Sequence, residues 1–217
     1  LIAYQGEITV VSVTDKLTSG PPYFVELGHS QPSRLLESEV AAVSELAKQA
    51  VKAVGIDNGA AHVEIILTKS GPKMVELGAR LGGDCICTHL VPLSTGVDMV
   101  KAVIDISLGY SPDLDSNINM GSAIRYITAN KGIISSINNV DNALRLPGVK
   151  DIYFNKKVGE SIDEIKSSAD RIGFVIAQGK DAEDAIRICE QAKSIIEIHT
   201  VDANLNTDTE EIRKNVR

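Results

Sequence analysis

Two short apolar stretches, each carrying one glutamate, constrain the fold of this chain more than any other feature. Residues 61–68 contain Glu64 and residues 73–77 contain Glu76. The intervening Lys69-Ser70-Gly71-Pro72 supplies the residues that a tight turn requires, so we expect the two stretches to pair as an antiparallel hairpin. Two acidic side chains then lie on neighbouring strands.

The apolar neighbours of these glutamates predict a bound cation. A carboxylate among Val, Ile, Met and Leu is costly to bury without compensation, and two facing carboxylates repel one another. A divalent cation between Glu64 and Glu76 resolves both problems, and Mg²⁺ prefers a few carboxylates together with phosphate oxygens. The alternative is an exposed hairpin whose glutamates face water, where most acidic residues lie.

The segment that follows the second glutamate predicts an anion site. Arg80 comes four residues after Glu76, and after Leu81 the chain continues with Gly82-Gly83-Asp84. A guanidinium group can hold a carboxylate or phosphate with two hydrogen bonds, and glycine lets backbone N–H groups approach the same anion. Together with the hairpin, this pattern favours an anion held beside a metal ion.

The rest of the sequence predicts an α+β protein. Residues 1–14 read as a hairpin with its turn at Gln5-Gly6, and the Gly- and Pro-rich segment Lys16–Arg34 reads as a long loop. Apolar residues at helical spacing predict helices over 35–54, ending at Gly55, and over 97–108. Beyond these we expect the strands 121–128, 132–137, 149–155 and 171–179, and the helices 140–146 and 181–197.

These elements predict two domains and a tail. The segment Gly109–Asp113 breaks the helical pattern, so we place one domain at 1–110 and a small α+β sandwich at 111–200. The polar residues from His199 predict a loosely held C-terminal tail, assigned as 201–217.

Composition excludes several functions. A net charge of −7 and few aromatic residues argue against nucleic-acid binding. No apolar run is long enough to span a membrane, and no signal-peptide pattern opens the chain. Three cysteines without a CxxC pair favour a reducing cytoplasm.

The hairpin and its continuation resemble the ATP-grasp superfamily, in which the second of two paired strands ends in Glu-x-Asn-x-Arg. This chain has Glu76-x-Gly78-x-Arg80. The match is close to the branch of carboxylate–amine ligases that contains L-amino-acid ligases together with related carbamoyl-phosphate-synthase-like and biotin-carboxylase-like proteins. Residues 24–33 resemble the loop that closes over the substrate in those ligases, and the region after 109 resembles their small C-terminal domain. The resemblance implies the C-terminal half of an ATP-grasp domain, an antiparallel sheet with helices, followed by that small domain.

The resemblance also implies residue roles. Glu64 and Glu76 would bind Mg²⁺ or Mn²⁺ that bridges the phosphates of ATP, and Arg80 would stabilise the transferring phosphoryl group or the acyl-phosphate. Because Gly78 lacks the side-chain oxygen of the usual Asn, the number of metal ions stays open. The remaining implied contacts are substrate binding by Glu26, His29, Gly82 and Gly83, and nucleotide binding by Lys16.

The implied reaction is an ATP-dependent ligation of a small carboxylate and an amine, releasing ADP and phosphate. The Glu26-x-x-His29 loop favours amino acids as substrates. The first residues read as the middle of a hairpin, and the lysines and glycine-rich lid of the family lie upstream of it. We therefore expect a fragment that is inactive alone and forms a homo-oligomer with its N-terminal portion. Two alternatives remain: a carbamoyl-phosphate-synthase, biotin-carboxylase or purine-type reaction, and a non-catalytic metal-binding or assembly module.

Overall fold

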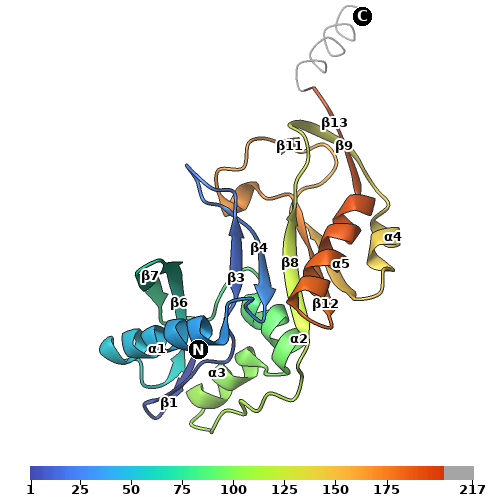
Figure 1. Cartoon of the computed structure of the whole chain (residues 1–217). Helices are drawn as coiled ribbons and strands as arrows, with labels where there is room; N and C mark the ends of the chain where they lie inside the picture. Colours follow the sequence, from blue (N-terminus) through green and yellow to red (C-terminus); the bar gives the residue numbers. More distant parts are fainter. Residues whose placement is uncertain (203–217) are drawn as a thin grey trace, which may run out of the picture. The chain divides into compact units, whose positions relative to one another are not determined.

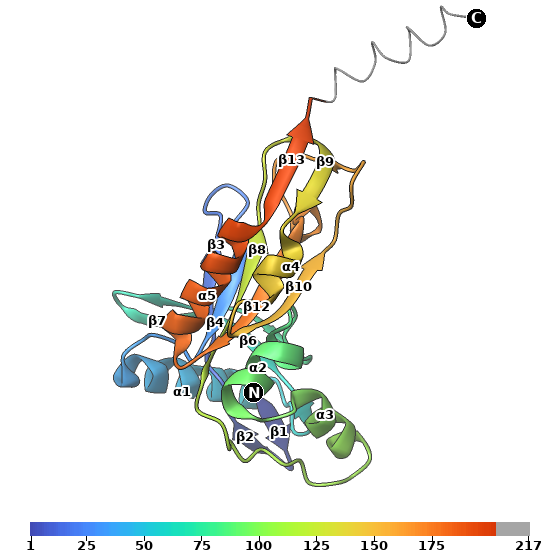
Figure 2. The same cartoon turned by 90° about the vertical axis from the view of Figure 1, so that its right-hand side faces the viewer.

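The computed structural model describes residues 1–202 (Figures 1 and 2). Contacts between residues divide the chain into two units. Both units are assembled from separate chain segments. The first unit comprises Leu1–Asp15, His29–Ala123 and Gln178–Ala185; the second comprises Lys16–Gly28, Ile124–Ala177 and the described residues from Ile186 onward.

The first unit opens with the expected hairpin. Strands β1 (Ile2–Tyr4) and β2 (Glu7–Thr9) pair antiparallel, and β5 (Gly59–Ala60) pairs with the other edge of β1. The turn residues Gln5 and Gly6 have φ of 50° and 80°. A two-residue turn with positive φ at both positions matches the twist of hairpin strands.

The glutamate hairpin is confirmed and is longer than expected. Strand β6 (His62–Thr68) pairs antiparallel with β7 (Gly71–Gly78). The register shifts after Glu64, so that Val75 is an extra residue on β7. Such a bulge re-aims side chains along the bulged strand.

Helix α1 (Glu37–Ala53) packs against this hairpin. Its apolar stripe buries Val43, Ala47 and Val51. The helix stops where the sequence predicted, because Gly55 takes the left-handed conformation with φ of 74°.

The remaining helices of the first unit were partly missed. Helix α3 (Met99–Ser107) lies within the predicted segment, but the π-helical turn η1 (Ile86–Leu90) and helix α2 (Val91–Thr95) were not expected. Both are too short to show a helical repeat of apolar residues.

The predicted loop Lys16–Arg34 is wrong, because it contains strands β3 (Asp15–Thr18) and β4 (Glu26–Gln31). A Cβ at Gly28 would lie 2.7 Å from the carbonyl oxygen of Ile124. This glycine therefore reflects close packing on the neighbouring strand rather than a turn. Strands β3 and β4 belong to a five-stranded sheet with the order β10-β12-β8-β4-β3. Its other strands are β8 (Gly121–Ile127), β10 (Val149–Phe154) and β12 (Gly173–Gly179).

The second unit also contains a sheet with the order β11-β9-β13. Its strands are β9 (Gly132–Asn138), β11 (Ser161–Ile162) and β13 (Glu197–Val201). Helix α4 (Val140–Leu144) packs against β10, and α5 (Ala182–Ile195) precedes β13. A 3₁₀ turn, η2, covers Ser168–Asp170.

Strand β13 corrects the expectation of a loose tail from His199, because His199 pairs with Ser136 on β9. The rest of the predicted tail, residues 203–217, lies outside the described residues. The predicted α+β class is confirmed, with antiparallel sheets accompanied by helices. Among residues 1–202, no helix combines the length and the apolar character needed to cross a membrane.

Candidate functional site

The two glutamates of the hairpin are direct cross-strand partners in the first unit. Glu64 on β6 stands opposite Glu76 on β7. The Glu64 side chain is 27% exposed and the Glu76 side chain 58% exposed. The site therefore has one sheltered and one accessible carboxylate, a mixture of the two environments that the sequence left open.

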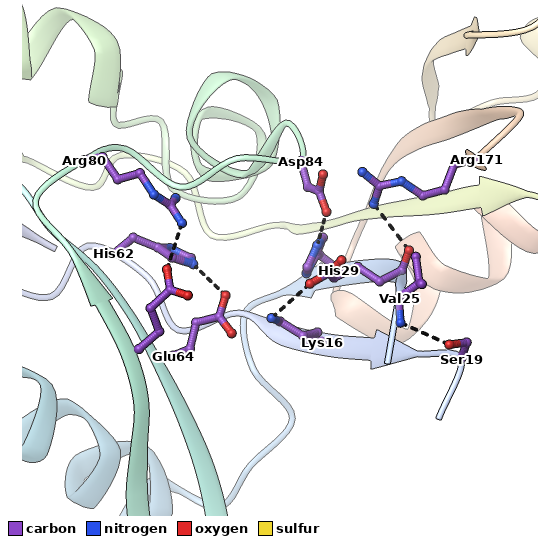
Figure 3. Close-up of polar contacts among 11 residues, drawn as sticks. Lys16, Ser19, Val25, His29, His62, Glu64, Arg80, Asp84 and Arg171 are labelled. Atoms are coloured by element: carbon purple, nitrogen blue, oxygen red, sulfur yellow. Dashed lines mark hydrogen bonds and ion pairs between the residues drawn. The ribbon is translucent and has the colours of Figure 1, made fainter. Parts of the chain in front are cut away.

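Each glutamate has a nitrogen-bearing partner (Figure 3). His62 Nε2 lies 3.5 Å from Glu64 Oε1, and Arg80 Nη2 lies 3.3 Å from Glu76 Oε1. Burial lowers the pKa of His62, the charge of Arg80 lowers it further, and Glu64 acts in the opposite direction. A neutral imidazole can still donate one N–H to the Glu64 carboxylate.

The two carboxylates fit a divalent cation shared with phosphate. No group of three His, Cys, Asp or Glu side chains among residues 1–202 could hold a metal ion. Mg²⁺ is commonly held by one or two carboxylates, with substrate phosphates and water completing its shell. Glu64 and Glu76 match that donor set.

Gly78 leaves space for Arg80. A Cβ at Gly78 would lie 3.2 Å from Arg80 Cγ and Nε. The Arg80 side chain thus lies against the position where the family pattern has Asn, and Arg80 Nη1 also donates to the carbonyl oxygen of Leu81 at 3.1 Å. A side chain at 78 would press on Arg80, which would have to shift by a few tenths of an ångström.

The loop that contains Gly82 and Gly83 is held by contacts of Gly82 with Cys87 and His62. The N–H of Gly82 donates to Cys87 Sγ at 3.1 Å, and a Cβ at Gly82 would lie 2.9 Å from His62 Nδ1. Burial raises the pKa of the Cys87 thiol, and the Gly82 N–H opposes this effect. An anion bound at Gly82 would have to share the N–H that already donates to Cys87. The surroundings of Gly83 are open, since a Cβ there would have no neighbour within 4 Å.

His29 has a partner that the sequence did not assign. His29 is 3% exposed, and its Nε2 lies 3.1 Å from Asp84 Oδ2. Asp84 and Cys85 both have left-handed backbone, with φ of 50° and 59°. This conformation is uncommon outside glycine, and it ends the glycine loop with the Asp84 carboxylate at His29. The place of Asp84 directly after Gly82-Gly83 was the signal that could have identified it.

Lys16 and Glu26 lie in the second unit and contact each other. Lys16 Nζ is 3.4 Å from Glu26 Oε1, while the backbone carbonyl of Glu26 accepts a hydrogen bond from Arg171 Nη1 at 3.3 Å (Figure 3). Sequence reasoning missed Arg171, which is distant in the chain and belongs to no recognised motif.

Two family models match the chain. Residues 1–88 match the ATP-grasp domain, and residues 125–201 match L-amino acid ligase C-terminal domain 2. The chain therefore contains an ATP-grasp domain, as the hairpin predicted. Its C-terminal part is of the type found in L-amino acid ligases.

Individual proteins are similar to this chain in sequence or in fold. The L-arginine-specific L-amino acid ligase of Bacillus subtilis is 25% identical over 86% of this chain and 46% of its own length. The L-amino acid ligase of Bacillus licheniformis has the same fold, with a TM-score of 0.80, 23% identity, and coverage of 93% of this chain and 50% of that one. Phosphoribosylglycinamide synthetase from Anaerococcus prevotii gives a TM-score of 0.82 at 23% identity, with coverage of 92% and 52%. The chain thus spans about half the length of each of these relatives.

Proposed function

We propose that the protein containing this chain is an ATP-dependent carboxylate–amine ligase that works through an acyl-phosphate and accepts an amino acid. The observation that carries the proposal is the pairing of Glu64 with Glu76 across the hairpin, with Arg80 at Glu76. The match of residues 125–201 to L-amino acid ligases supports the amino-acid substrate.

The proposed reaction has two steps. A substrate carboxylate oxygen attacks the γ-phosphorus of ATP, the bond to the β–γ bridging oxygen breaks, and ADP leaves. The amine nitrogen then attacks the acyl carbon, loses a proton, and expels phosphate to leave an amide. ATP-grasp enzymes in general use ATP and Mg²⁺.

In this scheme, the hairpin and the arginine that follows it bind the metal ion and stabilise the negative charge of the phosphoryl group. Glu64 and Glu76 would hold Mg²⁺, which when bound neutralises charge on the phosphate oxygens. The accessible guanidinium of Arg80 would stabilise the phosphoryl group in transfer and then the acyl-phosphate. His62 would orient the Glu64 carboxylate through its ring nitrogen.

The other proposed contacts complete the substrate and nucleotide sites. Glu26, His29, Gly82 and Gly83 would bind the substrate, and Lys16 would bind the nucleotide. Because the chain spans about half of each relative, the proposal concerns the protein as its gene encodes it, and we expect residues 1–217 alone to be inactive.

The domain and cellular assignments also remain proposals. We keep the division into a catalytic part at 1–110 and a small domain at 111–200, and we propose a homo-oligomer. We also propose a cytoplasmic location, since three cysteines without a CxxC pair fit a reducing compartment.

The test measures ADP release by the protein as its gene encodes it, against a panel of amino acids with MgATP. Glu76→Gln and Arg80→Gln should each lower amino-acid-dependent kcat by about 100-fold or more, since each removes charge stabilisation of the transition state. Glu45→Gln, an exposed glutamate on α1, is the matched control and should keep full activity.

Two results would count against the proposal. ADP release that needs bicarbonate instead of an amino acid would favour a carboxylase-type reaction. Amino-acid-dependent ADP release that is unchanged in both Glu76→Gln and Arg80→Gln would show that these two residues take no part in the reaction.

A further inference from the structure

Arg171 is a buried cation within the second unit. It precedes β12 by two residues and is 7% exposed. Arginine is almost never this buried unless its charge is compensated. Its contacts therefore indicate what it stabilises.

The guanidinium is held by carbonyl groups and by an aromatic face. Arg171 Nε donates to the carbonyl oxygen of Ser168 at 3.0 Å, and Nη1 donates to that of Glu26 at 3.3 Å. Its central carbon lies 3.8 Å from the centroid of the Tyr126 ring. A planar guanidinium can stack and donate at its edge at once, which an ammonium group cannot do.

The aromatic face is itself braced. The Tyr126 ring packs edge-on against Phe174 with centroids 6.1 Å apart, and Phe174 stacks on Tyr153 at 5.6 Å. These rings come from β8, β12 and β10 of the five-stranded sheet. The side chain of Arg171 thus packs on an aromatic cluster of this sheet.

The strand that Arg171 contacts has little freedom at its start. Glu26 is the first residue of β4, and two residues later Gly28 has no room for a side chain, since a Cβ there would meet Arg125 Nη1 and the carbonyl oxygen of Ile124 at 2.7 Å. Arg171 therefore supplies a second fixed point, at the residue whose side chain contacts Lys16.

We propose that Arg171 is a positioning residue for Glu26. The segment that matches L-amino acid ligase C-terminal domain 2 thereby fixes a substrate-binding strand of the segment that matches the ATP-grasp domain. The substrate part of this inference rests on the proposed function, in which Glu26 binds the amino acid. Its structural part rests only on the contacts of Arg171.

The experiment combines hydrogen exchange with kinetics on the protein as its gene encodes it. Arg171→Gln and Arg171→Lys should speed amide exchange in peptides covering 24–31 while peptides from the β9–β13 sheet keep the wild-type rate. Both variants should raise KM for the amino acid by about 10-fold or more, because small misplacements of a binding group cost that much, with KM for ATP within about twofold. Arg145→Gln removes an exposed arginine of the same unit and should change neither measurement.

Several outcomes overturn the inference. Unchanged exchange over 24–31 in folded Arg171→Gln excludes positioning of β4. Exchange that rises equally throughout the second unit, or a rise over 24–31 with unchanged amino-acid KM, reduces Arg171 to a structural residue.

A second variant guards against misfolding of the arginine substitutions. Tyr126→Leu removes the stacking face while leaving Arg171 in place, and it should give the same pattern with a smaller amplitude. Exchange requires no turnover, so it still decides the role of Arg171 if the wild-type protein releases no ADP with any amino acid. That last result would reject the proposed function alone.

Discussion

At the residue scale, the neighbouring glycines Gly82 and Gly83 have different surroundings. Gly82 lies between His62 and Cys87, and its N–H is bonded to the Cys87 sulfur. Gly83 faces open space and has no positive φ that would require glycine. The sequence Gly82-Gly83 reads as one feature, yet only the first glycine is needed for packing.

This difference gives a matched pair of substitutions. Gly82→Ala places a methyl group 2.9 Å from His62 Nδ1, so the ring must move and the free energy of unfolding should fall by roughly 1–3 kcal/mol. Gly83→Ala should stay within about 0.5 kcal/mol of wild type. Urea unfolding measures both, and equal losses in the two variants would show that the loop packs differently.

At the element scale, short-range capping explains where helix α3 begins. Asp98 precedes the helix with extended backbone, and its Oδ1 accepts a hydrogen bond from the N–H of Lys101 at 2.9 Å. The bond satisfies one of the N–H groups that a helix leaves without a partner in its first turn.

Substitution of Asp98 should lower the free energy of unfolding appreciably only when the side-chain oxygen that accepts the hydrogen bond is lost. Asp98→Ala should lower the free energy of unfolding by about 1 kcal/mol, whereas Asp98→Asn keeps a side-chain oxygen and should lower it much less. Thermal or urea unfolding of the two variants decides the matter. A similar loss for Asn would mean that the charge of Asp98, rather than its hydrogen bond, stabilises α3.

At the scale of the whole molecule, the compact units do not follow the order of the chain. The first unit recruits Gln178–Ala185 from far along the sequence. Within it, Gln178 Nε2 donates to the carbonyl oxygen of Leu93 at 2.7 Å. A Cβ on Gly121 would lie 1.9 Å from the carbonyl of Asp181, so these backbones are in close contact.

This interleaving predicts the behaviour of a truncated chain. Residues 1–123 contain the entire ATP-grasp match but lack Gln178–Ala185 and most of β8, so β4 loses one of its neighbours. We expect this polypeptide to unfold without a cooperative transition, as measured by circular dichroism during heating, whereas residues 1–202 unfold cooperatively. A sharp transition for residues 1–123 would show that the first unit folds without its later segment.

Much of the fold and half of the site could be predicted from local pattern. The β6–β7 hairpin, helices α1 and α5, and the facing of Glu64 and Glu76 all follow from side-chain periodicity and turn residues within a few positions of one another. The same patterns failed for β3 and β4, because a glycine packed against a neighbouring strand cannot be distinguished by sequence from a glycine in a loop.

By itself, then, the sequence determined the helical and strand segments with strong periodicity, the glutamate pair and its arginine, and the superfamily. Only the tertiary structure decided that Asp84 contacts His29 across 55 positions, and that Arg171 donates a hydrogen bond to the Glu26 carbonyl across 145. The physical reason is range: periodicity and turn chemistry act between near neighbours in the chain. Contacts between distant segments depend on the order of strands in the sheet, which no local pattern specifies.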